Sequence, residues 1–174
     1  MRDFDTISSP LGEMLASTDG EAIDGLWFLN QKYFPEREGW RRAPDHPVLR
    51  AVREQIDAYF AGELNEFSVP LAPRGTSFQE GVWDALLTIP YGVLSTYGDM
   101  AVQVGLPRAK ARAVGGAVGR NPISIIVPCH RVIGQSGSLT GYAGGLDRKR
   151  YLLALEKHGV AGVRPAFELV GNVA

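Results

Sequence analysis

The sequence predicts an α+β fold. The N-terminal part is a small antiparallel sheet with one helix, and the C-terminal part is mostly helical, with a winged-helix-like helix-turn-helix. Short apolar stretches separated by turn residues open the chain, which is typical of strands. Apolar residues at helical spacing begin after Pro47 and dominate beyond residue 75. We therefore divide the chain into two domains, 1–73 and 74–174.

The charge divides along the same boundary. The 174 residues carry a formal net charge of −1. Residues 1–73 hold 13 acidic and 7 basic residues, a net charge of −6, whereas residues 74–174 hold 6 and 11, a net charge of +5. A basic half beside an acidic half is typical of a protein that binds a polyanion such as nucleic acid, with chance clustering as the alternative.

Composition excludes several classes of protein. No apolar run approaches the roughly 20 residues of a membrane span, and the acidic start lacks a secretory signal, so we expect a cytoplasmic protein that binds no membrane. We also expect a monomer. A single cysteine excludes an internal disulfide. His46, His130 and His158 are too widely spaced for a zinc site, so we expect no metal and no cofactor.

In the N-terminal part, stretches 5–8, 14–18 and 22–28 are predicted strands. Ser9-Pro10-Leu11-Gly12 and Asp19-Gly20 are the turns between them. An amphipathic helix follows, ended by Gly62, and residues 62–75 are the predicted linker. The apolar face of this helix consists of Leu49, Val52, Ile56, Tyr59 and Phe60.

The C-terminal part begins with a predicted capping box, Ser77-Phe78-Gln79-Glu80, on a helix that runs toward Pro90. Thr96 and Asp99 frame a short helix start, Gly105-Leu106-Pro107 form a turn, and a second helix covers about 108–118. Helix, short turn, helix is an arrangement that binds DNA, and an ordinary packed helix pair is the alternative.

The second helix of this pair carries small residues that would allow a partner to approach its backbone closely. Arg108 and Arg112 are four residues apart, hence on one face, although a solvated face is the plainer reading of Arg112. Glycine inside a helix costs about 1 kcal/mol relative to alanine. Gly115 and Gly116 therefore indicate a close approach, either to a ligand or to another helix.

Cys129 follows an apolar run at 123–127 that we expect to be buried. A lone cysteine in such surroundings is usually an inert core residue. However, Pro128 favours a turn, and His130 and Arg131 place positive groups beside the sulfur, which would lower the thiol pKa. Adjacent residues of a strand point to opposite faces, so a direct Cys129–His130 pair requires a turn or a bridging water.

The last predicted helix covers 148–158, with Asp147 as its cap and Gly159 as its end. Within it Glu156 lies on the apolar side, after Leu152 and Leu153. A partly buried carboxylate requires a partner, and His130 is the candidate. The alternative is a surface ion pair with one of the basic residues near the start of the helix, Lys149 or Arg150.

Five segments of the C-terminal part together resemble the O6-alkylguanine-DNA alkyltransferases in order and spacing. The resemblance is close over residues 75–160, and in the N-terminal part the turn at 9–12 is its best feature. The segments are Arg112-Ala113-Val114-Gly115-Gly116, Asn121-Pro122, Ile126-Val127-Pro128-Cys129-His130-Arg131-Val132-Ile133, Gly141-Tyr142-Ala143-Gly144-Gly145-Leu146 and Leu152-Leu153-Ala154-Leu155-Glu156.

The resemblance implies direct-reversal DNA repair. Cys129 would irreversibly accept an alkyl group, such as methyl, from O6-alkylguanine or O4-alkylthymine in double-stranded DNA. His130 would take the thiol proton through a water, and Glu156 would orient the imidazole. The base would be rotated out of the duplex, and each molecule would act once because the thioether is not cleaved.

The resemblance also implies further roles. Tyr97 would donate a hydrogen bond to the leaving guanine, and Asn121 would hold the loop around Cys129, with a turn cap before Pro122 as the alternative. Arg112 would enter the space that the base leaves. The other DNA-contacting residues would be Arg108, Lys110, Ala113, Gly115 and Gly116. The base pocket would comprise Tyr97, Val132, Tyr142, Ala143 and Gly144.

The chain departs from the family pattern in two places. Ala143 lacks the hydroxyl that some relatives carry, so a donor to the guanine oxygen there would be a backbone group. Segment 107–112 is longer by one residue, which leaves the register of Arg108 and Lys110 open. Three rival functions remain: a lesion-sensing DNA-binding module, against which Cys129 argues, a sequence-specific regulator, and a cysteine hydrolase.

Overall fold

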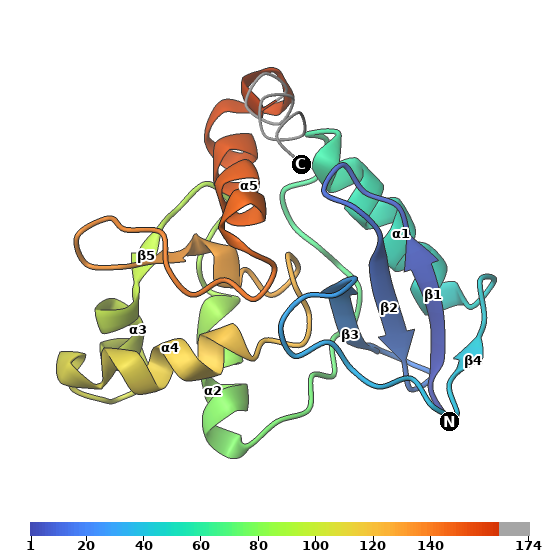
Figure 1. Ribbon diagram of the computed structural model, residues 1–174, viewed down its shortest axis with the longest axis horizontal. Coiled ribbons are helices and arrows are strands. Elements are labelled where there is room, and N and C mark those ends of the chain that lie inside the picture. Colours follow the sequence, from blue (N-terminus) through green and yellow to red (C-terminus); the bar gives the residue numbers. More distant parts are fainter. Residues whose placement is uncertain (164–174) are drawn as a thin grey trace.

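The computed structural model describes residues 1–163, so the end of the predicted second domain, 164–174, lies outside the described residues. Figure 1 shows a sheet with helix α1 on one side of the molecule and the remaining helices on the other, which confirms the α+β class. The elements are β1 (Asp3–Ile7), β2 (Met14–Thr18), β3 (Ile23–Phe28), β4 (Arg41–Arg42), α1 (Pro47–Phe60), α2 (Ser77–Leu86), β5 (Ser95–Thr96), α3 (Tyr97–Gln103), η1 (Arg108–Lys110), α4 (Ala111–Gly119), η2 (Cys129–Arg131), β6 (Val132–Ile133) and α5 (Leu146–His158).

The N-terminal sheet is mixed, with strand order β3-β2-β1-β4. The three predicted strands pair antiparallel as expected, but β4 pairs parallel to β1, so the prediction of a purely antiparallel sheet was wrong at that edge. Ion pairs hold β4 in place: Arg41 lies 2.8 Å from Asp3, and Arg42 lies 3.3 Å from Asp5. Two consecutive arginines lack the apolar alternation that identifies a strand from sequence.

Helix α1 covers the sheet with the apolar face that its spacing predicts. Pro47 occupies its first position, where a missing N–H costs nothing, and the His46 side chain accepts a hydrogen bond from the Val48 N–H. All five predicted face residues are buried, namely Leu49, Val52, Ile56, Tyr59 and Phe60.

Strand β3 connects the two halves of the molecule through its outer edge. Ile23 exchanges backbone hydrogen bonds with 70–72, within the predicted linker. Leu26 donates to the Pro122 carbonyl at 2.8 Å and accepts from the Ser124 N–H at 2.9 Å. The segment that leads to Cys129 is therefore hydrogen-bonded to the N-terminal sheet.

In the C-terminal part, α3 and α4 form the predicted helix-turn-helix pair. The predicted helix at 108–118 is divided: residues 108–110 form a 3₁₀ turn, η1, and α4 begins at Ala111. Helix α2 packs against α4, where the Trp83 indole donates to the Ala117 carbonyl at 2.9 Å. Within residues 1–163, no helix has the length and apolar character needed to cross a membrane.

Two predicted helix caps are displaced. The capping box of α2 uses Thr76, one residue earlier than Ser77, because the Thr76 hydroxyl accepts from the Gln79 N–H and the Gln79 side chain accepts from the Thr76 N–H. Asp147 is not the cap of α5: the helix begins at Leu146, after Gly145, and Asp147 lies in its first turn. Gly159 ends α5 as predicted, with φ 74°.

The position of the α2 cap can be tested by stability. Thr76→Ala removes the hydroxyl that accepts from the Gln79 N–H, so we expect a loss of about 1 kcal/mol in the free energy of unfolding. Ser77→Ala is the matched control and should change stability by less than about 0.5 kcal/mol. Urea denaturation of both variants measures this, and the opposite ranking would place the cap at Ser77.

Candidate active site

Cys129 lies on a 3₁₀ turn, η2, that follows the buried run 123–127. Its N–H donates to the Val127 carbonyl at 2.8 Å, and its side chain is buried. Because the chain turns here, Cys129 and His130 do not follow the alternation of a strand. The turn that a Cys129–His130 pair requires is therefore present.

Asn121 organises the segment that leads into this turn. Its side-chain amide donates to the Val127 carbonyl at 2.7 Å and the Ile123 carbonyl at 3.3 Å, and its oxygen accepts from the Ile123 N–H at 2.9 Å. Between these anchors Ile125 has φ 71°, a left-handed conformation that is costly for a β-branched residue. The Asn121 hydrogen bonds hold Ile125 in this unfavourable backbone conformation.

Glu156 is the centre of a buried hydrogen-bond network. His130 Nε2 lies 2.6 Å from Glu156 Oε2, and Arg131 donates from Nε to Oε1 at 2.7 Å and from Nη2 to Oε2 at 3.2 Å. Tyr59 donates to Oε2 at 2.7 Å, and the Gly92 N–H donates to Oε1 at 3.1 Å. We call these five residues the Glu156 network. Glu156 thus points inward to His130 rather than to Lys149 or Arg150.

Opposing effects set the charges in this network. Burial raises the pKa of Glu156, but the hydrogen bonds and charges of His130 and Arg131 outweigh it and hold the pKa well below its usual range. Burial lowers the pKa of His130 in spite of Glu156. As a result, an ionised Glu156 carboxylate faces a neutral His130 imidazole. With Nε2 bonded to Glu156, the lone pair of the neutral ring lies on Nδ1, a buried atom with no hydrogen-bond partner among the described residues.

The cation that acts on the Cys129 sulfur is Lys149. Burial raises the pKa of Cys129, while a hydrogen bond with Asn121 and the charge of Lys149 act in the opposite direction. Lys149 is fully buried and donates to the Val132 carbonyl at 2.6 Å and the Thr140 carbonyl at 2.9 Å. Burial lowers the pKa of Lys149 to about 8.

Arg131 was wrongly predicted to face the sulfur. It donates to the Glu156 carboxylate and to the Ile89 carbonyl, so its positive charge stabilises the ionised carboxylate. Tyr59 and Lys149 also belong to the site and were not predicted there. Lys149 could have been found, because it precedes Glu156 by two helical turns and so shares its face. For Tyr59 no signal distinguished it from the other apolar positions of α1.

A hollow of about 400 Å³ opens beside the helix pair. Of the five predicted base-pocket residues only Tyr97 borders it. Val132 and Tyr142 are buried, Ala143 is half-buried, and Gly144 borders a different cavity. The residues around the hollow are Tyr97, Gly98, Arg108, Ala111, Arg112, Gly115, Gly134, Gln135, Thr140 and Gly141.

Tyr97 closes one wall of this hollow. Its hydroxyl donates to the Thr140 carbonyl at 2.8 Å, and burial raises its pKa, so the phenol stays protonated and remains a donor. A Cβ on Gly141 would lie 3.1 Å from the Tyr97 hydroxyl oxygen, and Gly141 has φ 70°. Glycine at 141 therefore leaves this hydroxyl room and allows the turn beside it.

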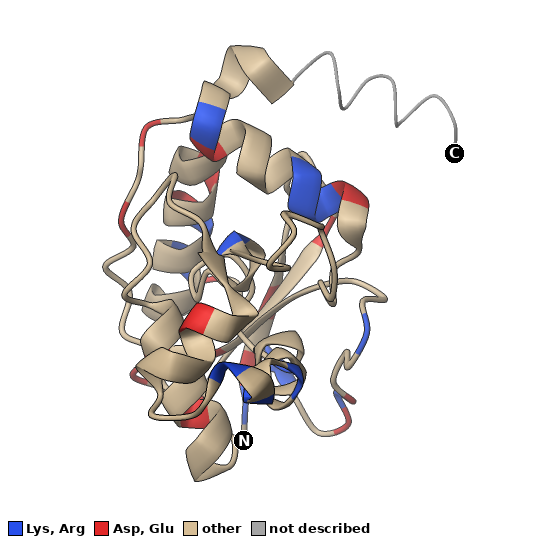
Figure 2. Cartoon of the chain, turned by 90° about the vertical axis from the view of Figure 1, so that its left-hand side faces the viewer, with Lys and Arg blue, Asp and Glu red and all other residues tan. Residues whose placement is uncertain are grey.

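The predicted DNA-contacting residues lie on the side of the molecule that faces the viewer in Figure 2, along η1 and α4. Arg108 forms an ion pair with Asp99, and Arg108 and Arg112 both border the hollow. A Cβ on Gly116 would meet nothing within 4 Å, so helix packing does not explain this glycine. The exposed residues of the set are Arg108, Lys110, Arg112, Ala113 and Gly116.

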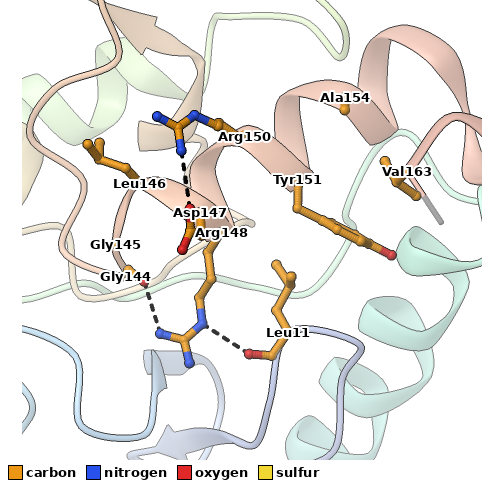
Figure 3. Close-up of a pocket in the computed structure, with 10 residues that line it drawn as sticks. All are labelled: Leu11, Gly144, Gly145, Leu146, Asp147, Arg148, Arg150, Tyr151, Ala154 and Val163. Atoms are coloured by element: carbon orange, nitrogen blue, oxygen red, sulfur yellow. Dashed lines mark hydrogen bonds and ion pairs between the residues drawn. The ribbon is translucent and has the colours of Figure 1, made fainter. Parts of the chain in front are cut away.

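A second cavity, of about 450 Å³, lies where α5 meets the N-terminal turn (Figure 3). Arg148 crosses this junction: it donates from Nη1 to the Gly144 carbonyl at 2.9 Å and from Nε to the Leu11 carbonyl at 3.0 Å. Neither Cys129 nor the Glu156 network borders the cavity. Its polar contacts join the two parts of the molecule.

Two protein-family profiles match the chain. Residues 4–73 match the description "6-O-methylguanine DNA methyltransferase, ribonuclease-like domain". Residues 77–158 match "6-O-methylguanine DNA methyltransferase, DNA binding domain".

Curated relatives and solved structures agree with these profiles. A methylated-DNA–protein-cysteine methyltransferase of Mycobacterium tuberculosis is 55% identical over 157 residues, covering 90% of this chain and 93% of its own. One of Haemophilus influenzae is 47% identical over 165 residues, covering 91% of each chain. The structure of Mycobacterium tuberculosis OGT in complex with DNA matches with a TM-score of 0.84 and 52% identity, over 89% of this chain and 92% of that chain.

The charge on Glu156 should make stability depend on pH. Its folded pKa lies below the ordinary value of 4.5, so its contribution is complete above that value and is lost as the pH falls below it. Glu156→Gln leaves Arg131 buried without its counter-charge, so we expect a loss of about 3 kcal/mol at neutral pH. The decline in stability below about pH 5 should also become shallower.

Thermal and urea unfolding across this pH range measure both effects. Asp147→Asn is the matched control because Asp147 pairs with Arg150 at an exposed position. This control should cost less than about 1 kcal/mol. Equal losses for the two variants would contradict the central place of Glu156.

Proposed function

The chain belongs to the methylated-DNA–protein-cysteine methyltransferase family, and on that premise we propose that Cys129 is the residue that accepts the alkyl group. The protein is a DNA-repair methyltransferase that reverses alkylation directly and works once per molecule. One observation carries the proposed site: a buried cysteine precedes a histidine whose Nε2 lies 2.6 Å from an ionised, buried carboxylate.

The transfer is a displacement at carbon. The Cys129 thiol gives its proton to His130, through a water that reaches Nδ1, and the sulfur then attacks the alkyl carbon bound to guanine O6. The sulfur–carbon bond forms as the carbon–oxygen bond breaks, and the electron pair of the broken bond leaves with guanine. Glu156 stabilises the imidazolium that results. The product is a thioether, which no group of this site cleaves.

Tyr97 is the proposed donor to the leaving base. Its protonated hydroxyl lies at the wall of the 400 Å³ hollow and is bonded to the Thr140 carbonyl at rest. Redirecting this hydrogen bond to guanine would offset the negative charge that develops as the alkyl carbon departs. Asn121 is proposed to hold the turn around Cys129 through its bonds to the Ile123 and Val127 backbone.

The proposed DNA interface is η1 and α4. Lys110 and Arg112 are exposed, with Arg108 paired to Asp99, and the small residues of α4 allow a close approach to a groove. Arg112 borders the hollow and is the proposed side chain that fills the space left by the rotated base. We also propose that the damaged base is O6-alkylguanine or O4-alkylthymine.

The domain boundary, the oligomeric state and the location of the protein are also proposed. We place the domain boundary between 73 and 74, in agreement with the ranges of the two family profiles. We propose that the protein acts as a monomer in the cytoplasm, with access to DNA. A basic second half predicts binding that weakens with salt.

The transfer can be tested on the intact protein. After incubation with a duplex that contains one O6-methylguanine, we expect a mass gain of one methylene group per molecule, located on Cys129 by peptide mapping. Cys129→Ser and an unmodified duplex are the controls, and neither should show the gain. Tight binding without a mass gain would leave a lesion-sensing module, and neither gain nor binding would refute the proposal.

Arg112 can be tested by comparing two substrates. If it fills the space left by the base, Arg112→Ala should slow transfer from a duplex by roughly tenfold, which corresponds to about 1.4 kcal/mol. Transfer from a single strand that carries the same lesion should change little, because no base has to leave a stack. Arg150→Ala, on α5, removes the same charge elsewhere, and an equal effect of both variants would indicate charge alone.

A further inference from the structure

Tyr59 joins the N-terminal domain to the proposed catalytic carboxylate. It lies on α1, its ring is fully buried, and its hydroxyl donates to Glu156 Oε2 at 2.7 Å. Oε2 is also the oxygen that lies 2.6 Å from His130 Nε2. The ring is held by aromatic contacts with Phe60, at 5.3 Å between centroids, and with Phe67, at 5.5 Å.

We propose that Tyr59 is a positioning residue of the alkyl transfer, which sets the proton affinity of His130 through Glu156. This inference rests on the proposed function of Cys129 and His130. It also gives the N-terminal domain a chemical part in the reaction, because, within residues 1–163, the only hydroxyl bonded to the carboxylate comes from α1.

The hydrogen bonds at the carboxylate fix which nitrogen of His130 carries its proton. Glu156 accepts from Tyr59, Gly92, His130 and Arg131, which together occupy both oxygens. An ionised carboxylate only accepts hydrogen bonds, so His130 must present an N–H at Nε2 and keep its lone pair at Nδ1. Burial raises the pKa of Tyr59 and keeps its phenol a donor.

The shared oxygen explains how Tyr59 reaches His130. A phenol that donates to Oε2 withdraws electron density from the oxygen that faces the imidazole. Without this donor the carboxylate would hold a proton on His130 more strongly, and the pKa of His130 would rise. The imidazole would then be free to take the Cys129 proton only at higher pH.

Several other groups face this pair and must be considered in any pH profile. Glu156 also faces Arg131 and Tyr91, and His130 faces Arg131 and Lys149. Lys149, with a pKa of about 8, and Cys129, with a raised pKa, titrate on the alkaline side. The acidic limb of the profile is therefore the one that reports His130.

The test is Tyr59→Phe in the full-length protein, which removes one oxygen and keeps the ring. We expect the acidic limb of the methyl-transfer rate to move to higher pH by roughly half a unit. The pKa of His130, followed by nitrogen NMR in a chain with only three histidines, should move in the same direction. Phe60→Leu is the control that disturbs the same aromatic packing without touching Glu156.

The outcomes separate this inference from the proposed function. An unchanged acidic limb and an unchanged His130 titration in Tyr59→Phe would overturn it, as would an equal shift in Phe60→Leu. If the unmodified protein transferred no methyl group to Cys129, the proposed function would fail. The NMR titration would still decide whether Tyr59 controls His130.

Discussion

The buried carboxylate of Glu156 is the interaction on which the rest of the site depends. Among the described residues, its five hydrogen bonds come from α1, from the loop before β5 and from the turn that carries the cysteine. Taking a carboxylate out of water is unfavourable unless cations and donors replace the solvent, so these segments have to meet at one point. Arg131 supplies the charge, and Tyr59 and Gly92 complete the hydrogen bonds. The requirement fixes α5 against both halves of the chain.

A second constraint acts on the other side of the cysteine turn. Leu26 of β3 exchanges backbone hydrogen bonds with Pro122 and Ser124, and Asn121 closes the segment through its side chain. Ile125 adopts its left-handed conformation between these anchors. Cys129 is therefore held from two directions, by the sheet before the turn and by the carboxylate after it. These contacts fix the cysteine turn against both parts of the molecule.

Sequence patterns predicted the structural features that depend on the local spacing of apolar and turn residues. The three long strands, the buried face of α1 and the helix pair follow from periodicity and composition, whereas spacing alone left Glu156 open between His130 and a surface ion pair. Strand β4 was missed because ion pairs rather than apolar alternation hold it. Arg131 was assigned to the sulfur because neighbours in sequence were taken as neighbours in space. The role of Tyr59 depends on how α1 meets α5, which no local pattern records.

The electrostatics of the turn affect the reactivity of Cys129 through the pKa values of its thiol and of the His130 imidazole. Burial raises the pKa of Cys129 and lowers that of His130, so at neutral pH both groups are uncharged at rest. A neutral thiol is a poor nucleophile and a poor target for oxidants, which would protect a proposed acceptor that can be used only once. Lys149 and Glu156 act against burial, one favouring the thiolate and the other the imidazolium. In the proposed transfer, Lys149 would favour the Cys129 thiolate and Glu156 the His130 imidazolium, from positions that are fixed before the alkyl group arrives.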